Sequence, residues 1–200
     1  MLMHKKIHKH FQTVDPVLFR TLRKIKEPED IVASRDLFTD LCDAIISQQL
    51  SNKVAAILVE RLKILLGGAF SPHEIITTSD DDIRKQGISY AKIASLKDLS
   101  NRLIQKELEF ESLSTLPNDE VVSRLIQVRG IGPWTAEMFL MFSLGREDVF
   151  SAGDGGLKRA IKQLYGFKQD PTKEEMLALS EKWAPYRTYA CRILWRSLDI

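Results

Sequence analysis

The sequence has little of what marks several specialised protein classes. Only two of its 200 residues are cysteines, Cys42 and Cys191, which excludes a disulfide framework and a cysteine-based metal cluster. The 29 basic residues exceed the 27 acidic ones by only two, so binding to a polyanion must come from local patches. With 44% apolar and 28% charged residues, the composition is that of an ordinary globular chain.

Long apolar segments are also missing. No run approaches the length of a transmembrane helix, and the opening MLMHKKIHKHF lacks the apolar centre of a signal peptide. We therefore expect a cytoplasmic protein with no membrane partner. The histidines of this opening, His4, His8 and His10, are interpreted as part of a solvated basic arm rather than as metal ligands.

The remaining pattern predicts an all-α fold, because no window alternates like a strand for long. Asp15 and Pro16 open a helix, and Ser79 to Gln86 and Ser89 to Leu108 have helical patterns. Capping-box spacing at Ser71–Glu74 and Thr172–Glu175 predicts two more helix starts.

A turn between two expected helices carries the first functional signal. In LIQVRGIGPWTAEMFL, Gly130 and Gly132 lie two places apart, and Pro133 suits the first position of the following helix. Amides at a helix start lack partners within the helix and carry partial positive charge, so the turn is a candidate phosphate site. Many structural helix pairs also turn this way, and the turn alone leaves both interpretations open.

A single carboxylate carries the second signal. Asp154 lies between Gly153 and Gly155 in DVFSAGDGGL, directly before the helical run LKRAIKQLYG. It suits a helix N-cap, which contributes about 1 kcal/mol to stability. The same position would hold a carboxylate rigidly for chemistry, and the two roles are compatible.

Together these motifs resemble the helix-hairpin-helix DNA glycosylases. With SQQLS upstream and PYRTYACRILW downstream, the chain is most similar to the 3-methyladenine DNA glycosylase II branch, from about Leu37 to Trp195. The resemblance implies two helical lobes flanking a DNA-binding cleft within one compact domain, residues 1–200. We expect a hairpin lobe of about 37–165 and a second lobe from the arm 1–36 and the helices of 166–200. The four-cysteine run of iron–sulfur relatives is absent.

The resemblance also assigns a wedge. A base in duplex DNA must be flipped out before it can be cut from its sugar, and a side chain must fill the gap. Gln48, Gln49 and Leu50 of SQQLS correspond to this wedge. An ordinary helix junction with surface glutamines is the alternative.

The base pocket is expected to be aromatic, because an alkylated purine is positively charged and binds ring faces. Trp134 and Trp195 match pocket positions of the branch, and Met138 stands where better-known relatives have an aromatic residue. Additional wall residues are expected among Phe139, Tyr186 and Tyr189, whereas Trp183 is assigned to the core.

The DNA backbone is expected to meet the amides of Gly130, Gly132 and Thr135, with Lys92 as a further phosphate contact or, equally, a solvated lysine. Relatives hold a monovalent cation, Na⁺ or K⁺, with carbonyls that correspond here to Ile126, Val128 and Gly130. No other cofactor is expected.

The predicted function is a monofunctional DNA-3-methyladenine glycosylase II, a monomer that hydrolyses the N-glycosidic bond of alkylated bases in double-stranded DNA during base excision repair. Asp154 is the predicted catalytic residue. Trp134 stands where lyase relatives have a lysine, so no lyase activity is expected, and Ser151 replaces a usual proline. Alternatives are a non-catalytic DNA-binding module, or a glycosylase for uracil, mismatched thymine or oxidised purine. The protein would be associated with the nucleoid in a prokaryote and nuclear in a eukaryote.

Overall fold

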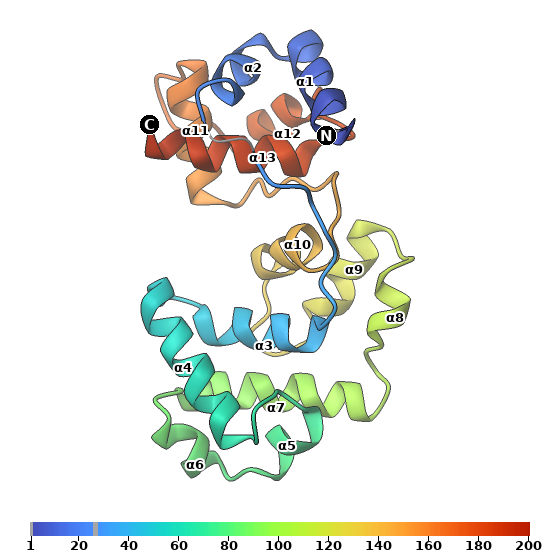
Figure 1. The fold of residues 1–200 in the computed structure, drawn as a ribbon, viewed down its shortest axis with the longest axis vertical. Helices are drawn as coiled ribbons and strands as arrows, with labels where there is room; N and C mark the ends of the chain where they lie inside the picture. Colours follow the sequence, from blue (N-terminus) through green and yellow to red (C-terminus); the bar gives the residue numbers. More distant parts are fainter. Residues whose placement is uncertain (1, 26–27) are drawn as a thin grey trace. The chain divides into compact units, whose positions relative to one another are not determined.

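The computed structural model describes residues 2–25 and 28–200, with the side chains of residues 2–4, His4 included, outside the description. Thirteen α-helices and one 3₁₀ helix make up its secondary structure, and no strand occurs among these residues (Figure 1). The predicted all-α fold is confirmed. None of the helices in the described part is long and apolar enough to cross a membrane.

The chain forms two compact units, which we call the middle unit, Ser34–Phe139, and the terminal unit, Met1–Ala33 with Leu140–Ile200. The chain therefore leaves the terminal unit before α3 (Leu37–Ser47) and returns to it within α10 (Pro133–Phe142). The sequence led us to expect the hairpin lobe to extend to residue 165. Instead, residues 140–165 group with the two chain ends, because α11 (Gly155–Tyr165) packs on α13 (Arg187–Arg196) and α2 (Pro16–Leu22).

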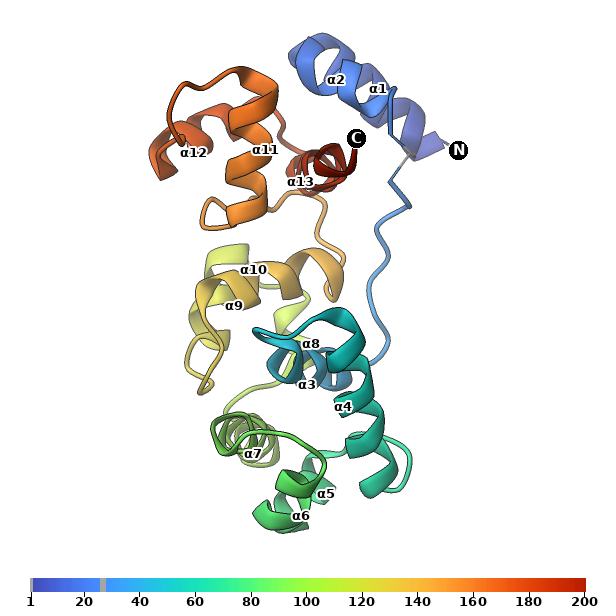
Figure 2. The same cartoon turned by 90° about the vertical axis from the view of Figure 1, so that its left-hand side faces the viewer.

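The middle unit is built around one long central helix, α7. Its other helices include α5, which packs against α7, and α3, which contacts both α4 and α7 (Figure 2). The helices are α3 (Leu37–Ser47), α4 (Asn52–Leu65), α5 (Pro72–Thr77), α6 (Asp80–Lys85), α7 (Tyr90–Ile104), α8 (Phe110–Leu113), α9 (Asn118–Leu125) and α10 (Pro133–Phe142). Ile93, Leu96 and Leu99 of α7 are fully buried, so this side of the helix lies in the core.

The terminal unit packs around α13, which contacts α11 and α2. Its elements are α1 (Leu2–Val14), α2 (Pro16–Leu22), α11 (Gly155–Tyr165), α12 (Lys173–Glu181), α13 (Arg187–Arg196) and the 3₁₀ helix η1 (Ser197–Asp199). The opening segment is a helix rather than a solvated arm, because Ile7 and Phe11 lie one turn apart and are both buried.

The predicted helix starts mostly hold. Asp15 caps α2, and Thr172 with Glu175 forms a complete capping box at α12. The box predicted at Ser71 is wrong: Ser71 precedes α5 but makes no side-chain capping bond. Trp183 is completely buried, as expected of a core residue.

Candidate functional site

The glycine turn of the middle unit connects α9 to α10 and is fastened to α7. Gly130 has φ +79°, and a Cβ there would collide with the side chain of Ser95. The carboxylate of Asp98 accepts the Arg129 amide at 2.8 Å. Gly130 is therefore required by both conformation and space, and the turn has one fixed position on α7.

Gly132 differs from Gly130. Its φ is not left-handed, and a Cβ built there meets no atom within 4 Å. The carbonyl of Gly132 accepts the Ala136 amide at 3.0 Å, so this glycine directly precedes the first turn of α10. The fold of the free chain therefore does not require a glycine at this position.

The start of α10 places backbone amides beside the turn. Pro133 occupies the first helical position, and Trp134 and Thr135 follow it. Amides in the first turn of a helix have no acceptor within that helix, and the positive end of the helix dipole lies there. This geometry is compatible with the anion site that the sequence predicts at the turn, which stays a prediction.

The predicted wedge is joined directly to this turn. The side-chain nitrogen of Gln48 donates to the Gly130 carbonyl at 2.8 Å and to the Thr135 hydroxyl at 3.4 Å. Gln48 caps the end of α3 and is half-buried, whereas Gln49 is exposed and has φ +60°. The Leu50 amide closes the bend by donating to the Ser47 carbonyl at 3.1 Å. Of the three wedge residues, Gln49 is thus the most accessible, and Gln48 holds the bend against the hairpin.

Lys92 of α7 contacts the same bend, at the end of α3. Its ammonium donates to the carbonyls of Ile46 and Gln48 at 2.6 and 2.9 Å. These two carbonyls are among the last of α3, so Lys92 satisfies acceptors that the helix end leaves open. Burial lowers the pKa of Lys92 from its ordinary value. Lys92 thus supports the bend that carries the predicted wedge, and its predicted phosphate contact stays a prediction.

The pocket residues predicted in α10 differ in exposure. Trp134 is 48% exposed, and Met138 is intermediate. Phe139, expected as an additional wall, is buried and stacks against Phe110 with ring centroids 6.3 Å apart. Trp134 and Met138 belong to the middle unit, whereas Trp195 belongs to the terminal unit.

Asp154 occupies the predicted N-cap of α11. Its Oδ1 accepts the Leu157 amide at 2.7 Å and the indole N–H of Trp195 at 2.9 Å. The residue is only 8% exposed. A carboxylate this buried is costly unless it is hydrogen-bonded, and here the helix start and a tryptophan supply the bonds.

Gly156, rather than the two glycines that flank Asp154, makes this contact possible. A Cβ at Gly156 would lie 3.0 Å from Asp154 Oδ1 and 3.1 Å from the Trp195 ring. Gly153 and Gly155 would each tolerate a Cβ without contact. Ser151 is fully buried and its carbonyl accepts the Asp154 amide at 3.1 Å, so the loop before Asp154 is closely packed.

The tryptophan that binds Asp154 also meets an aromatic residue that sequence reasoning missed. Phe142 lies with its ring centroid 5.9 Å from that of Trp195, at an interplanar angle of 32°. Although Phe142 is at the end of an apolar helix, it is 47% exposed. Its aromatic type next to the motif DVFSAGDGGL was the available signal. Tyr189, expected to be part of the wall, is instead 1% exposed and belongs to the core.

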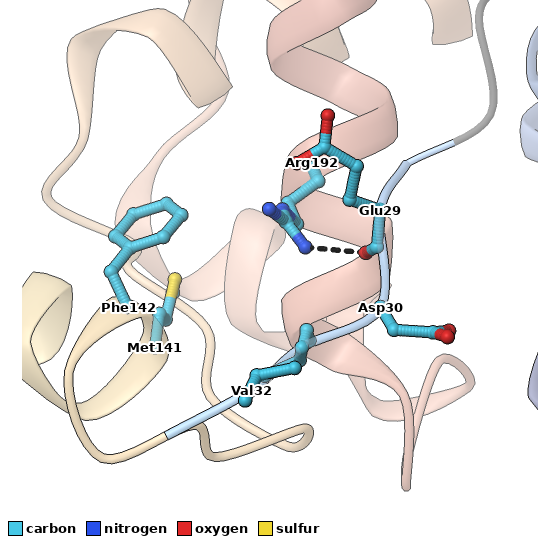
Figure 3. A pocket seen from close by; sticks show the side chains of 7 residues that line it. Glu29, Asp30, Val32, Met141, Phe142 and Arg192 are labelled. Carbon is cyan, nitrogen blue, oxygen red and sulfur yellow. Dashed lines mark hydrogen bonds between the residues drawn. The ribbon is translucent and has the colours of Figure 1, made fainter. Parts of the chain in front are cut away.

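A pocket of the terminal unit lies on Phe142 (Figure 3). Its volume of about 280 Å³ is just below the usual range for ligand pockets, so it has room for a small group only. The guanidinium of Arg192 extends across it, donating to the Glu29 carbonyl at 2.7 Å and lying 5.9 Å from the Phe142 ring centroid. The lining residues are Glu29, Asp30, Ile31, Val32, Met141, Phe142 and Arg192.

Two of the three carbonyls predicted to hold a cation already accept a hydrogen bond. Gly130 O accepts the Gln48 side chain at 2.8 Å, and Val128 O accepts the Ile131 amide at 3.1 Å. A carbonyl oxygen has two lone pairs, so each retains one for an ion. No group of three or more His, Cys, Asp or Glu side chains in the described residues could hold a metal ion.

Comparisons with known proteins agree with this geometry. A family model described as HhH-GPD superfamily base excision DNA repair protein matches residues 42–185. DNA-3-methyladenine glycosylase 1 of Schizosaccharomyces pombe is 36% identical over 173 residues, which cover 85% of this chain and 76% of that protein. DNA-3-methyladenine glycosylase of Bacillus subtilis is 30% identical, covering 92% of this chain and 64% of its own length. The chain spans 61% of a second B. subtilis relative.

Two solved structures share the fold. The S. pombe 3-methyladenine DNA glycosylase in complex with abasic DNA has a TM-score of 0.86 at 33% identity, covering 98% of this chain and 97% of that one. A DNA-3-methyladenine glycosidase from Bacillus halodurans has a TM-score of 0.85 at 36% identity, and the match covers 94% of this chain and 88% of that one.

Proposed function

Because this chain belongs to the HhH-GPD superfamily of base excision DNA repair proteins, we propose that it is a DNA glycosylase that removes alkylated bases from double-stranded DNA. Its substrates in this proposal are 3-methyladenine and related N-alkylpurines, and it acts as a monomer. Its relatives named as DNA-3-methyladenine glycosylases support this substrate class.

One observation carries the proposal: Trp195 donates to Asp154 at 2.9 Å. The contact joins a buried carboxylate to an aromatic ring that in turn stacks on the half-exposed Phe142. A module that only binds DNA needs neither a buried carboxylate nor an aromatic surface beside it. This pairing therefore favours an enzyme over a non-catalytic hairpin module.

In the proposed reaction the C1′–N bond breaks and positive charge develops on the sugar. The carboxylate of Asp154 stabilises that charge and orients or deprotonates the attacking water. The bond electrons leave with the base, and the oxygen of water becomes the new substituent at C1′. The Leu157 amide and the Trp195 indole hold the carboxylate in one orientation before the reaction begins, so little reorganisation is needed as the charge develops.

Base recognition in the proposal depends on the aromatic residues. An N-alkylated purine carries a positive charge, and ring faces attract it. Phe142 and Trp195 offer such faces in the terminal unit, and Trp134, which is 48% exposed, offers one in the middle unit. A neutral uracil or oxidised purine gains less from these rings, which ranks them below alkylated purines as substrates.

DNA binding in the proposal uses the middle unit. The amides of Gly130, Gly132 and Thr135 approach a phosphate, and Gln49 with Leu50 enters the space of the flipped base. Ile126, Val128 and Gly130 would hold a Na⁺ or K⁺ ion through their carbonyls, and such an ion would attract a DNA phosphate. The enzyme needs no other cofactor.

The proposed reaction is hydrolysis without strand cleavage. A lyase forms a Schiff base between an amine and C1′, and Trp134 occupies the position of the lysine nucleophile in lyase relatives. Lys158 lies on α11, beyond Asp154. The arginine that follows it in the sequence cannot act as the nucleophile, because a guanidinium stays protonated. Incubation with lesion-containing DNA and borohydride should therefore trap no covalent adduct. An adduct that disappears in Lys158→Ala would show that the reaction type is wrong.

The direct test measures free bases released from methylated DNA by chromatography. Release of 3-methyladenine, with strand breaks only after alkali, is the expected result. Asp154→Asn serves as the matched control because it keeps the shape of the side chain. DNA binding without release of any base would identify a non-catalytic module, and release of uracil or an oxidised purine alone would identify another glycosylase.

A further inference from the structure

The loop that carries Asp154 is fastened along one face of α13. Residues 143–154 connect α10 to α11, and the part of this loop that contacts α13 is 146–154. The residues of α13 that contact this loop follow each other at intervals of one, three and four positions, which places them on one side of the helix. They are Arg187, Thr188, Cys191 and Trp195.

Thr188 makes the most contacts with the loop. Its hydroxyl donates to the Arg146 carbonyl at 2.6 Å and accepts the Val149 amide at 3.1 Å. Its own amide donates to the Glu147 carbonyl at 2.9 Å. The residue is completely buried, so no water can replace the hydroxyl if it is removed.

Arg187 holds the same segment with a two-pronged ion pair. Its Nε and Nη2 donate to the two carboxylate oxygens of Asp148 at 2.6 and 2.8 Å, and its amide donates to Oδ1 at 3.3 Å. Both side chains are about one-third exposed, so the pair adds little to overall stability. The two parallel hydrogen bonds of the guanidinium fix the orientation of the Asp148 carboxylate, which a lysine cannot do.

The fixed part of the loop extends to the carboxylate itself. Val149, Ser151 and Ala152 are buried, and the Asp154 amide donates to the Ser151 carbonyl at 3.1 Å. At the far end Trp195 binds Asp154 Oδ1 at 2.9 Å. Buried residues and hydrogen bonds therefore connect residues 146–149 to Asp154, so a shift of this segment is transmitted toward the carboxylate.

We propose that Thr188 and Arg187 are positioning residues that set the place of the Asp154 carboxylate through the 146–149 segment. The inference rests on the proposed function for its kinetic readout. The motif PYRTYACRILW thereby supplies the helix face on which the Asp154 loop is aligned.

The test compares Thr188→Val, which has the same shape without the hydroxyl, with Thr188→Ser, which keeps it. In Thr188→Val, single-turnover excision at saturating DNA should fall about tenfold, because small misplacements of a catalytic group cost rate. Affinity for abasic DNA should stay at the wild-type value. Thr188→Ser should restore the rate. A Val variant as fast as wild type, or a Ser variant as slow as Val, would overturn the proposal.

A spectroscopic readout separates positioning from general destabilisation. The indole N–H resonance of Trp195, assigned from its loss in Trp195→Phe, reports the hydrogen bond to Asp154. It should move in Thr188→Val and stay at the wild-type position in Thr188→Ser. A folded Val variant with an unmoved resonance would contradict the inference.

Arg187→Lys gives a second route if Thr188→Val does not fold. It should slow excision several-fold and move the same resonance, whereas an unchanged rate and resonance would count against Arg187. Asp170→Asn is the matched control, because Asp170 pairs with Lys162 at 2.7 Å on the exposed end of α11, away from the loop. A wild-type protein that releases no base would defeat the proposed function alone, since the Trp195 resonance still tests the positioning.

Discussion

The middle and terminal units hold their candidate functional groups by opposite means. In the middle unit, side-chain donors fix the main chain: Gln48 binds the Gly130 carbonyl, and Lys92 binds the carbonyls of Ile46 and Gln48. In the terminal unit, one main-chain amide and one indole fix a side-chain carboxylate, Asp154. The first arrangement presents neutral backbone amides to a ligand, whereas the second presents a charge.

The difference follows from what each group must do. An anion site made of amides depends on the shape of the turn. It therefore needs a glycine such as Gly130, and it needs side chains that hold the backbone in place by hydrogen bonds. A charged carboxylate that is largely removed from water needs hydrogen bonds to offset the cost of its burial. Substitutions in the middle unit should therefore act on DNA binding and base flipping, and those around Asp154 should act on the chemical step.

The largest effect is expected for Asp154→Asn. Excision in a single turnover should fall on the order of 100-fold or more, as for removal of other preorganised electrostatic groups. The variant should fold and bind abasic DNA, because an N-cap contributes only about 1 kcal/mol and Asn is itself a good cap. Rapid-quench assays with saturating enzyme measure the rate. Near-wild-type excision would remove Asp154 from the catalytic role.

Asp15 provides a structural counterpart of Asp154 in the same unit. Both cap a helix and both accept a tryptophan indole, but Asp15 is 1% exposed and also binds Tyr165 at 2.6 Å and Lys182 at 3.0 Å. Asp15→Asn should destabilise the protein by about 3 kcal/mol at neutral pH, as for loss of one partner in a buried charged network, while any protein that remains folded excises normally. Urea unfolding measures the first effect.

The pH dependence of Asp15 sharpens this prediction. Burial alone raises its pKa, but the hydrogen bonds from Tyr165, Trp183 and Lys182 outweigh burial and lower the pKa below its ordinary value. The stabilisation is therefore present above the unfolded-state pKa of about 3.9 and is lost as the pH falls through the lower folded-state pKa. The difference in the free energy of unfolding between the wild type and Asp15→Asn should become smaller below about pH 4. A constant gap would contradict an ionised Asp15.

The two hairpin glycines should separate folding from binding. Gly130→Ala should destabilise the middle unit by about 2 kcal/mol, because a left-handed residue gains a Cβ with no space beside Ser95. Gly132→Ala should leave the melting temperature unchanged, since its Cβ meets nothing, and Gly132→Asp should weaken binding to every DNA sequence similarly. Calorimetry and DNA titrations measure these effects. A destabilised Gly132→Ala would overturn the distinction.

The smallest expected effect concerns Lys92. Lys92→Met should slow base flipping and excision by several-fold without changing the salt dependence of binding, whereas loss of a phosphate contact would reduce the salt slope by about 1. Lys97→Met is the matched control, because Lys97 is on the same helix and binds the Thr78 carbonyl at 3.1 Å. Titrations at several salt concentrations with a fluorescent base analogue beside the lesion distinguish the two roles. If Lys92→Met instead reduced the salt dependence of DNA binding, Lys92 would be a contact to a DNA phosphate.

The sequence by itself determined the helical fold, the hairpin and the cap at Asp154, because each depends on local chemistry. Pro133 at a helix start, Gly130 in a left-handed turn and an Asp before a helix are short-range preferences that a few residues express. The start of α12 at its capping box is another example. The helix at the N-terminus was missed because its basic residues hid the buried pair Ile7 and Phe11.

Only the tertiary structure decided which residues meet across long separations. Lys92 lies 44 residues from Gln48 and Trp195 lies 41 residues from Asp154, and no local preference encodes either contact. Gly156 matters because of the ring of Trp195 that packs on it, and Gly132 is free of such contact. The sequence specified which groups were available, and packing chose their partners, since a buried polar group takes the donor or acceptor that the fold brings to it.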